Sequence, residues 1–404
     1  MVDGLGQRTD EEIVVVGGGI GGLSAALSFA RDGRRVRVLE RADSFAEVGA
    51  GLQLAPNATR LLDRLGLLEA VQQAGVTPAR LVIADARSGE GLASADLGAR
   101  FRRTFGAPYV VIHRHDLLQI LLTACQQAGV ALETGREVVR AVSQGPQAHI
   151  ECADGSTYAA HAVIGADGLR SALRAELHAD GEPVASGYVA YRGALPIEQV
   201  ERPHDLDTVI VWVGPGLHLV QYPIRRGEMY NQVAVFRSPA YAAGAADWGT
   251  PEELDEAFSA MCRPVRTAMP SLQRNFRWPT YDRAPVDRWV DGRAALLGDA
   301  AHPMLQYLAQ GACQAIEDAV TVAQQFARHD TASAGERGVE RALAAYESIR
   351  APRAARVQRA ARAWGDIWHI DGTGAMLRNE LLRTIEDDDF SYADWLWGWR
   401  LPGD

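Results

Sequence analysis

Residues 13–40, IVVVGGGIGGLSAALSFARDGRRVRVLE, decide the fold of this chain. The β-branched run 13–16 predicts a strand of a parallel sheet, because a strand buried on both faces is continuously apolar. The apolar segment from 23 to about 31 predicts a helix with Gly33 as its C-terminal stop, and 36–39 predicts a second strand. The order strand, glycine-rich turn, helix, strand is that of a βαβ unit.

Three glycines follow the first predicted strand with the spacing G-x-G-x-x-G: Gly17, Gly19 and Gly22. They allow a tight turn and a close approach of the backbone to a pyrophosphate. Amides at the start of the helix then hold the phosphates, and Glu40, which ends the second strand, holds the hydroxyls of an adenosine ribose. The spacing predicts a dinucleotide site, but by itself it fits either FAD or NAD.

The uncharged stretch 13–30 is also long enough for a short membrane span or the apolar part of a signal peptide. However, Asp10, Glu11 and Glu12 precede it, where a signal peptide carries positive charge, and patterned glycines interrupt it. We expect no membrane span and a cytoplasmic protein. Its four cysteines are far apart in the sequence, so we expect reduced thiols and neither disulfides nor a zinc site.

The basic side chains are all arginine: the 404 residues include 41 arginines and no lysine, against 51 Asp and Glu, for a formal net charge of −10. The absence of lysine excludes a pyridoxal-phosphate Schiff base and a P-loop. An acidic chain is also a poor binder of nucleic acid or of anionic membranes. Anionic ligands must then be held by backbone amides and a few arginines, for which Arg114, Arg192 and Arg283 are candidates.

Three later segments select FAD over NAD. They are 165–171 (GADGLRS), 298–303 (GDAAHP) and the pair Gly311-Ala312 at the start of a predicted helix. Each alone is typical of an Asp-Gly turn or a helix cap. Together and in this order they resemble the flavoprotein aromatic hydroxylases, the group A FAD monooxygenases.

The resemblance implies bound FAD and a set of residues that hold it. In that family the first segment serves both FAD and the visiting nicotinamide, and the second places its aspartate on the ribityl chain of the flavin. The chain has no second G-x-G-x-x-G, as in relatives that bind NADH only transiently. Besides the fingerprint and Glu40, the expected cofactor contacts are Arg41, Arg114, Asp167, Asp299, Gly311 and Ala312.

The fold expected from pattern and resemblance is α/β with three parts. Residues 187–277 contain antiparallel strand patterns, 294–297 another short apolar strand, and 316–327 and 338–363 helices. We expect a Rossmann-like FAD-binding domain of the glutathione-reductase type, a β-sheet substrate domain and a C-terminal helical region. The predicted bounds are 1–75, 105–186 and 282–345 for the first part, 76–104 and 187–281 for the second, and 346–404 for the third.

Within the family, the chain is most similar to enzymes that hydroxylate 3-hydroxybenzoate para to its phenol, which gives gentisate. The similarity lies in 217–223 (LHLVQYP), 302–307 (HPMLQY) and 394–399 (DWLWGW). Gln306 is the informative residue, because many relatives, salicylate hydroxylases among them, carry a proline there. An amide can hydrogen-bond a substrate phenol, which proline cannot do.

The reaction implied by the resemblance needs a base beside the phenol. A reduced flavin and O₂ give a C4a-hydroperoxide, which attacks an aromatic ring made electron-rich by loss of the phenol proton. Histidine is the side chain best suited to take that proton near pH 7. We expect His218 to take it while Gln306 fixes the phenol oxygen. Tyr222, four residues on in the same predicted strand, shares the face of His218.

Other interpretations stay open. A salicylate- or 6-hydroxynicotinate-type enzyme decarboxylates as it hydroxylates, a flavin reductase or dehydrogenase inserts no oxygen, and a flavin-binding sensor has lost turnover. Without the resemblance, His218 and Tyr222 read as core residues of a strand. The tryptophans of the tail predict packing on the protein body or a homodimer contact, and not a nucleic-acid platform.

Overall fold

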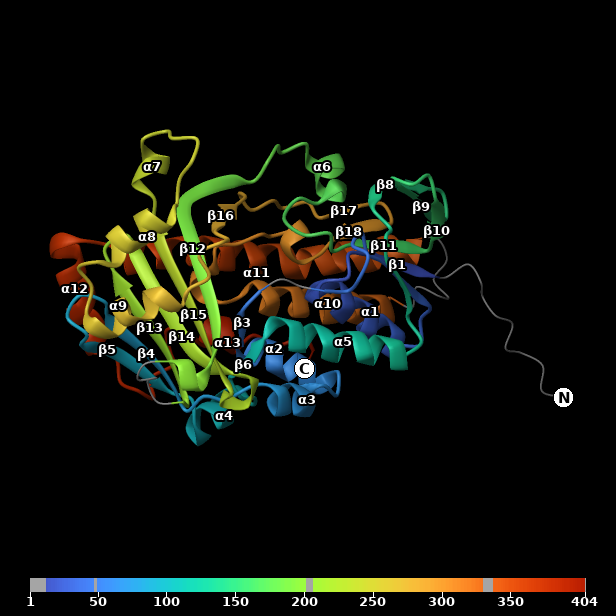
Figure 1. Ribbon diagram of the computed structural model, residues 1–404. Coiled ribbons are helices and arrows are strands. Elements are labelled where there is room, and N and C mark those ends of the chain that lie inside the picture. The colour runs from blue at the N-terminus through green and yellow to red at the C-terminus, as the bar shows by residue number, and fades with distance from the viewer. Residues whose placement is uncertain (1–11, 47–48, 201–205, 330–336, 404) are drawn as a thin grey trace.

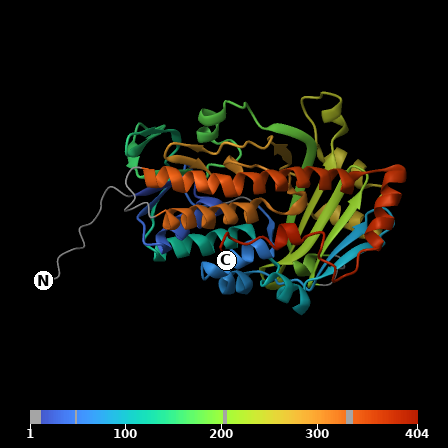
Figure 2. The same cartoon turned by 180° about the vertical axis from the view of Figure 1, so that it is seen from behind.

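The computed structural model describes residues 12–46, 49–200, 206–329 and 337–403 (Figure 1). Two sheets lie side by side, and the long helix α11 (Arg337–His369) runs along both of them (Figure 2). Asp10 and Glu11, which the sequence sets before the first strand, lie outside the described residues.

The first sheet carries the predicted βαβ unit. Its strand order is β17-β18-β11-β1-β2-β7, and neighbouring strands are parallel except β17 and β18. All four residues of β1 are buried between β11 and β2, as the apolar run predicts. The strands are β1 (Ile13–Val16), β2 (Val36–Leu39), β7 (Ala131–Glu133), β11 (Ala162–Gly165), β17 (Val290–Asp291) and β18 (Ala294–Leu296).

Helix α1 (Ile20–Arg31) begins three residues before the start that the apolar pattern predicts. Glycine carries no hydrophobic signal, so the pattern cannot detect a first turn made of Gly21 and Gly22. The earlier start directs the unpaired first amides of the helix towards the glycine turn. The helix ends as predicted, since Gly33 follows with a φ of +78° and its N–H donates to the carbonyl of Ala30 at 3.0 Å.

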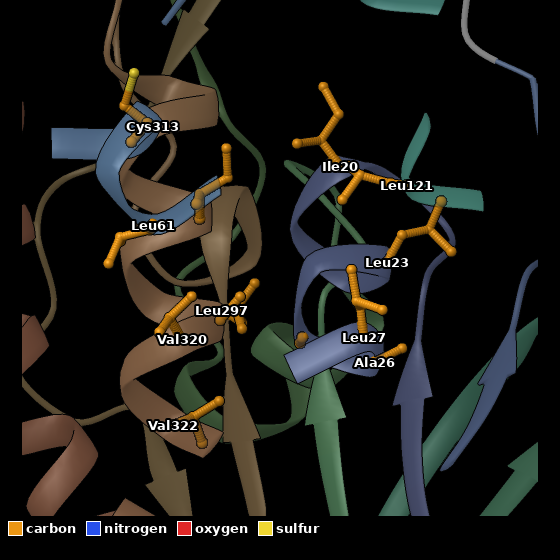
Figure 3. Packing of buried hydrophobic residues seen from close by; sticks show 14 of the residues in the cluster. Ile20, Leu23, Ala26, Leu27, Leu61, Leu121, Leu297, Cys313, Val320 and Val322 are labelled. Atoms are coloured by element: carbon orange, nitrogen blue, oxygen red, sulfur yellow. The ribbon is translucent and has the colours of Figure 1, made fainter. Parts of the chain in front are cut away.

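Apolar packing fixes α1 in place. It packs against α5 (Arg114–Gln127) and α10 (Gly311–Arg328), and α10 packs in turn against α2 (Pro56–Arg64). Figure 3 shows Leu27 of α1 in the same buried cluster as Val320 of α10. A buried leucine or valine contributes about 1.5–3 kcal/mol, so this cluster holds the N-terminal end of α1 firmly against the first sheet.

The second sheet has the order β16-β12-β15-β14-β13-β4-β5 and is antiparallel except between β13 and β4. Its register sets Arg192 of β12 opposite Val233 of β15, and Val233 opposite Val220 of β14. Because side chains alternate along a strand, His218 and Tyr222 share the face of Val220. The strands are β4 (Arg80–Asp85), β5 (Gly91–Asp96), β12 (Val184–Pro196), β13 (Thr208–Gly214), β14 (Leu217–Ile224), β15 (Met229–Arg237) and β16 (Trp278–Asp282).

Smaller elements complete the fold. The pair β3 and β6 lies beside the second sheet, where β6 contacts β14. Strands β8, β9 and β10 form a separate antiparallel sheet that contacts β11 and β18 of the first sheet. These strands are β3 (Gly51–Leu54), β6 (Val110–His113), β8 (Val138–Gln144), β9 (Gln147–Cys152) and β10 (Thr157–Ala160).

The remaining helices are α3 (Leu68–Ala74), α4 (Ala99–Phe105), α6 (Ala172–His178), α7 (Pro239–Ala242), α8 (Pro251–Phe258), α9 (Arg263–Ala268), α12 (Gly372–Arg383) and α13 (Asp394–Trp397). The 3₁₀ turns are η1 (Ile197–Gln199), η2 (Arg225–Gly227), η3 (Met269–Ser271), η4 (Gly298–Ala300) and η5 (Gln306–Leu308).

The C-terminal region is helical, as predicted. Helix α11 covers the expected helix 338–363, contains Pro352 without a break, and continues six residues further to His369. The tail then packs on the protein body: the ring centroid of Trp397 lies 5.6 Å from that of Phe101 and 5.8 Å from that of Phe105. Tail packing on the body is the first of the two alternatives that the tryptophans indicated.

The division into domains stays a prediction. Residue 346, the expected start of the C-terminal region, lies inside α11, while the strands of the second sheet come from 80–96 and 184–282. The stretch 13–30 forms β1, a turn and most of α1, and no helix in the described ranges is long and apolar enough to cross a membrane. All four cysteines are free thiols.

Candidate active site

A cavity of about 1220 Å³ is lined by residues from both sheets and from α11 and α12. The residues expected from the sequence converge on it from distant parts of the chain. With the exception of Gly22, all of the predicted site residues line it: Gly17, Gly19, Glu40, Arg41, Arg114, Asp167, His218, Tyr222, Asp299, Gln306, Gly311 and Ala312.

Gly22 has its place inside the turn and does not face the cavity. A Cβ on Gly22 would lie 1.9 Å from the carbonyl oxygen of Gly17, which leaves no room for any side chain. Gly17 has a φ of +103°, and a Cβ there would lie 2.4 Å from the carbonyl oxygen of Ala166. The glycines therefore let β1, α1 and the loop after β11 approach one another, which leaves the backbone open to a phosphate.

Glu40 stands at the end of β2 with its carboxylate held in place. Oε2 accepts a hydrogen bond from the N–H of Gly18 at 2.6 Å, and Oε1 accepts one from the N–H of Ala42 at 2.9 Å. Each carboxylate oxygen has two lone pairs, so both keep acceptor capacity for ribose hydroxyls. The exposed side chain of Arg41 lines the cavity beside it.

Two further aspartates reach the cavity on loops that follow strands of the first sheet. Asp299 is exposed in η4. Asp167 caps α6, since its Oδ2 accepts from the N–H of Ala172 at 2.9 Å, but its Oδ1 is buried without a partner. Burial raises the pKa of Asp167. A buried oxygen without a partner is unusual and marks a place where a ligand can complete the hydrogen bonding.

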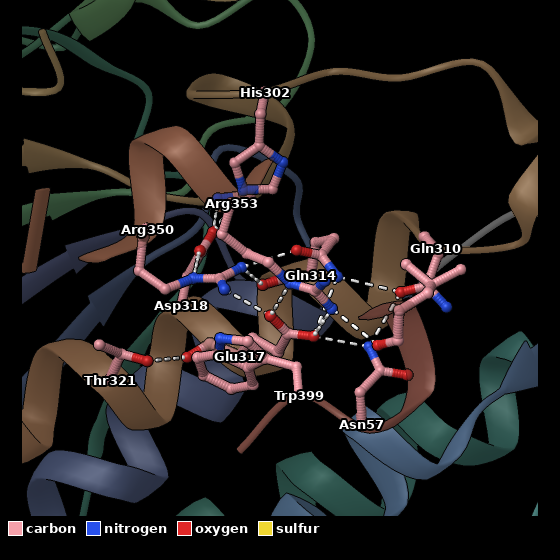
Figure 4. A network of polar contacts seen from close by, with 12 residues as sticks. Asn57, His302, Gln310, Gln314, Glu317, Asp318, Thr321, Arg350, Arg353 and Trp399 are labelled. Atoms are coloured by element: carbon pink, nitrogen blue, oxygen red, sulfur yellow. Dashed lines mark hydrogen bonds and ion pairs between the residues drawn. The ribbon is translucent and has the colours of Figure 1, made fainter. Parts of the chain in front are cut away.

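A buried ionic group, which we call the paired network, holds η4 and α10 against α11 (Figure 4). It consists of Glu317, Asp318, Arg350 and Arg353 with His302. Asp318 accepts from Nε of Arg350 at 2.7 Å and from Nε2 of His302 at 2.5 Å, and Arg350 also pairs with Glu317. Glu317 accepts from Nη2 of Arg353 at 3.1 Å.

The paired network also fixes the loop that carries Asp299. The N–H of Gly298 donates to Oδ2 of Asp318 at 2.9 Å, so a carboxylate in the middle of α10 sets the position of η4. Arg353 donates to the carbonyls of Trp395 and Leu396 at 2.7 and 2.8 Å, which ties the tail to the same place. These contacts give His302 a structural position.

The second sheet contributes His218 and Tyr222 from one face of β14. His218 is 1% exposed, and its Nδ1 lies 2.8 Å from Nε2 of His369 at the end of α11. Burial, and to a smaller degree His369, holds the pKa of His218 well below its ordinary value, so the imidazole is neutral near pH 7. Burial raises the pKa of Tyr222, so its hydroxyl keeps its proton.

Gln306 and Arg192 meet at the same face of the sheet. Oε1 of Gln306 accepts from Nη2 of Arg192 at 3.4 Å, and because a guanidinium can only donate, the amide oxygen must be the atom that faces it. Nε2 of Gln306 and Nε of Arg192 are both buried without a partner. In the described residues Arg192 forms no ion pair with a carboxylate, although its guanidinium lies 5.7 Å from the ring centroid of Trp278. We call His218, Tyr222, Gln306 and Arg192 the polar wall.

Arg283 is not part of this site. Its Nη1 donates to Asp180 at 2.8 Å and to the carbonyl of Gly181 at 2.7 Å, outside the cavity lining, so the expectation that it contacts an anionic ligand is wrong. His369, in contrast, is a neighbour of the site that the sequence did not reveal. It lies 151 residues from His218, at the end of a helix whose length the pattern underestimated.

The residues present fit FAD. The glycine turn carries no side chains that would keep a phosphate from its backbone. Glu40 can still accept hydrogen bonds from ribose hydroxyls, and Oδ1 of Asp167 has no partner. At the N-terminus of α10, a Cβ on Gly311 would meet nothing within 4 Å, so this helix end faces open space in the cavity. Backbone amides and the positive end of a helix dipole suit the anionic parts of a flavin nucleotide.

Comparisons with known proteins agree with this fit. The family described as FAD binding domain matches residues 10–361. The chain is 41% identical over 389 residues to 3-hydroxybenzoate 6-hydroxylase 1 of Aquipseudomonas alcaligenes, covering 96% of this chain and 97% of that one. It is 38% identical over 391 residues to 3-hydroxybenzoate 6-hydroxylase of Klebsiella oxytoca, covering 96% of each.

A further relative and a solved structure also match over nearly the whole chain. A 3-amino-4-hydroxybenzoate 2-monooxygenase of Streptomyces cremeus is 37% identical, covering 96% of this chain and 95% of its own. The crystal structure of Klebsiella pneumoniae HpxO with FAD and uric acid superposes with a TM-score of 0.81 at 27% identity, covering 95% of each chain. The chain therefore belongs to the FAD-binding family of flavoprotein aromatic hydroxylases.

Proposed function

We propose that this enzyme hydroxylates 3-hydroxybenzoate para to its phenol to give gentisate, with FAD as cofactor, NADH as reductant and O₂ as the source of oxygen. The observation that carries the proposal is the unpartnered amide Nε2 of Gln306 on the same cavity wall as a neutral, buried imidazole, His218. An amide donor and an imidazole acceptor together suit one phenol oxygen that must lose its proton.

Bound and reduced FAD supplies an electrophilic oxygen taken from O₂. The chain would hold the dinucleotide with the amides of the glycine turn, with Glu40 on its ribose, and with Asp299 and the N-terminus of α10 near the flavin. Arg114 and Asp167 complete the expected contacts. The paired network contributes indirectly, because Asp318 holds the backbone of η4.

The polar wall prepares the substrate for attack. Nδ1 of His218 is already bonded to His369, so Nε2 is the nitrogen left for the cavity. Nε2 accepts the phenol proton, and the amide of Gln306 donates to the resulting phenolate oxygen and stabilises its charge. Fixing that oxygen sets which ring carbon faces the flavin, and para hydroxylation follows if the opposite carbon does.

Arg192 is our choice for the substrate carboxylate. It lies in the same row across the sheet as Val220, two strands away, which is roughly 10 Å in the direction of the interstrand hydrogen bonds. His218 lies two residues from Val220 along β14. A guanidinium with a buried, unpartnered Nε and no ion pair in the described residues suits a carboxylate, and the meta arrangement of 3-hydroxybenzoate can bridge the two positions.

The separation of the base from the cation distinguishes this proposal from the enzyme alternatives. A salicylate- or 6-hydroxynicotinate-type reaction places its phenol or pyridone beside the leaving carboxylate, so His218 on β14 and Arg192 two strands away on β12 suit it less well. A reductase or dehydrogenase would need no base on the wall, and a sensor would need none of these buried polar groups. We also propose a cytoplasmic location and a homodimer.

Product analysis tests the proposal directly. The purified holoenzyme is given NADH, O₂ and each of 3-hydroxybenzoate, salicylate and 6-hydroxynicotinate. The proposal expects 3-hydroxybenzoate alone to accelerate NADH oxidation with about one gentisate formed per NADH. Catechol from salicylate would support the decarboxylating alternative, and hydrogen peroxide without any hydroxylated product would support the reductase.

A further inference from the structure

His369 forms a hydrogen bond that the proposed reaction has not yet used. Its Nε2 lies 2.8 Å from Nδ1 of His218, and the two rings lie within 20° of parallel with centroids 5.1 Å apart. Two neutral imidazoles can bond only if one nitrogen donates and the other accepts. The tautomer of His369 therefore dictates the tautomer of His218, and so decides whether His218 presents a lone pair or an N–H to the cavity.

The surroundings hold His369 in this orientation. The ring of Tyr188 stacks on it at 4.6 Å and 22°, and the ring of Tyr307 meets it edge-on at 5.3 Å. Its carbonyl accepts from the N–H of Gly216 at 2.9 Å, which ties the end of α11 to the turn before β14. These contacts restrain both the ring and the backbone of His369.

The pair also spans the distance from the cavity to the surface. His218 is 1% exposed, whereas His369 is 9% exposed and is followed by the exposed residues Ile370 and Asp371 at the turn into α12. Nε2 of His218 has no partner among the described residues and belongs to a ring that lines the cavity. One end of the pair thus meets the substrate space, and the other end lies close to solvent.

The electrostatics keep both rings ready to pass a proton without retaining it. Burial, together with a smaller effect of the nearby guanidinium of Arg378, lowers the pKa of His369 to about 4. Burial also lowers the pKa of His218. Neither imidazole is therefore charged at neutral pH, and a proton that enters the pair has a driving force to leave it.

From these contacts we infer that His369 is a positioning residue for His218, and that the two imidazoles form a path which carries the phenol proton from the cavity to solvent. The inference rests on the proposed role of His218 as the base. In the starting state, His218 carries its proton on Nδ1 and donates to Nε2 of His369, which carries its own proton on Nδ1.

The transfer balances at each atom. The phenol O–H bond breaks and an N–H bond forms at Nε2 of His218; the Nδ1 proton of His218 moves to Nε2 of His369; and the Nδ1 proton of His369 leaves to water. Both rings end as the opposite tautomer, still neutral. When the ring becomes aromatic again, the C–H bond at the hydroxylated carbon breaks and its proton leaves to water. The original phenol oxygen regains a proton through the reverse transfer, which restores both starting tautomers.

The experiment measures the proton itself. Holoenzyme in weak buffer with a pH-indicator dye is mixed with 3-hydroxybenzoate in a stopped-flow instrument, without NADH, while the near-ultraviolet band of bound phenolate is followed. In wild type we expect proton release in the same phase as the phenolate band. His369→Gln keeps a donor and an acceptor but cannot relay a proton, so release should slow at least 10-fold, with substrate affinity within threefold of wild type.

Two controls separate relay from packing. His369→Phe keeps the stack on Tyr188 but bonds to nothing, so it should lose both proton release and phenolate formation. Tyr188→Phe keeps the ring against His369 and does not line the cavity, so it should behave as wild type. Proton release at the wild-type rate in His369→Gln, or the absence of proton release in a wild type that forms gentisate, would overturn the inference.

A measurement on wild type alone covers the case in which the variants do not fold. In ¹⁵N-histidine-labelled holoenzyme, the inference expects His218 protonated on Nδ1 and His369 accepting on Nε2 before substrate is added, with both tautomers reversed in the phenolate complex. A proton found on Nε2 of His369 in the substrate-free protein contradicts it. Failure of the proposed function is distinct, because then wild type would form no gentisate at all.

Discussion

The protein buries two groups of polar side chains, and they differ in what they leave unpaired. In the paired network, the charges of Glu317 and Asp318 are matched by those of Arg350 and Arg353, and one ring nitrogen, Nδ1 of His302, is buried without a partner. In the polar wall, Gln306 and Arg192 keep buried N–H groups without partners. A buried donor that makes no hydrogen bond costs about 1–3 kcal/mol of stability. The charges of the first group are paired within the fold, whereas we propose that a bound ligand completes the hydrogen bonding of the second.

The largest effect is expected from the polar wall. His218→Ala removes the base, so the rate of hydroxylation should fall roughly 10²–10⁴-fold. Reduction of the flavin by NADH should change little, because His218 acts on the substrate. Rapid-reaction kinetics measure the reduction, and the ratio of gentisate to NADH measures the coupling. His149→Ala, at an exposed histidine of β9, is the matched control. If His218→Ala still formed one gentisate per NADH, His218 would have no catalytic role and would serve the structure only.

The paired network should instead respond in stability. Arg350→Met leaves Glu317 and Asp318 short of a counter-charge in a fully buried place, so the free energy of unfolding should fall by about 3–5 kcal/mol. The matched control is Arg274→Met, which breaks the exposed pair with Asp255 and should cost about 0–1 kcal/mol. Urea denaturation of both variants gives the comparison. A small loss in Arg350→Met would show that the network contributes little to the fold.

Acid should destabilise the protein through His369, which is buried as a neutral imidazole. Burial lowers the pKa of His369 from 6.5 to about 4. Between pH 6.5 and about 4, the imidazole of His369 is protonated in the unfolded chain but stays neutral in the folded protein. Stability is therefore unaffected above pH 6.5 and is lost as the pH falls towards 4, by on the order of 2–3 kcal/mol from this residue. Denaturation at pH 7 and 4.5 should show a smaller loss in His369→Gln than in wild type; equal losses would mean that His369 is not held neutral.

The smallest expected effect concerns the carboxylate end of the wall. A hydrogen bond to a charged group contributes about 1.5–3 kcal/mol, so Arg192→Gln should raise the KM for 3-hydroxybenzoate roughly 10- to 100-fold. The KM for the neutral analogue 3-hydroxybenzamide should rise much less in Arg192→Gln, because this analogue has no carboxylate. Steady-state kinetics with the two substrates measure the difference. An equal loss for both would indicate that Arg192 does not bind the carboxylate and acts on the wall in another way.

Much of the cofactor site follows from local sequence. A run of β-branched residues, glycines at fixed spacing and an acidic residue at the next strand end predict β1, α1 and Glu40, because each depends on the preferences of a few neighbouring residues. In this unit only the predicted start of α1 was wrong, because glycines in the first turn of a helix give no hydrophobic pattern. His218 and Tyr222 could be assigned to one face of a strand for the same local reason.

What the sequence alone determined is thus the βαβ unit, the glycine turn and the candidate residues of β14. Which distant groups meet them depends on the packing of the whole chain: Arg283 pairs with Asp180 away from the cavity, Arg192 bonds to Gln306, and His369 bonds to His218 across 151 residues. The physical reason is that strand pattern and turn chemistry depend on neighbours in the chain, whereas a hydrogen bond between buried side chains depends on how sheets and helices pack.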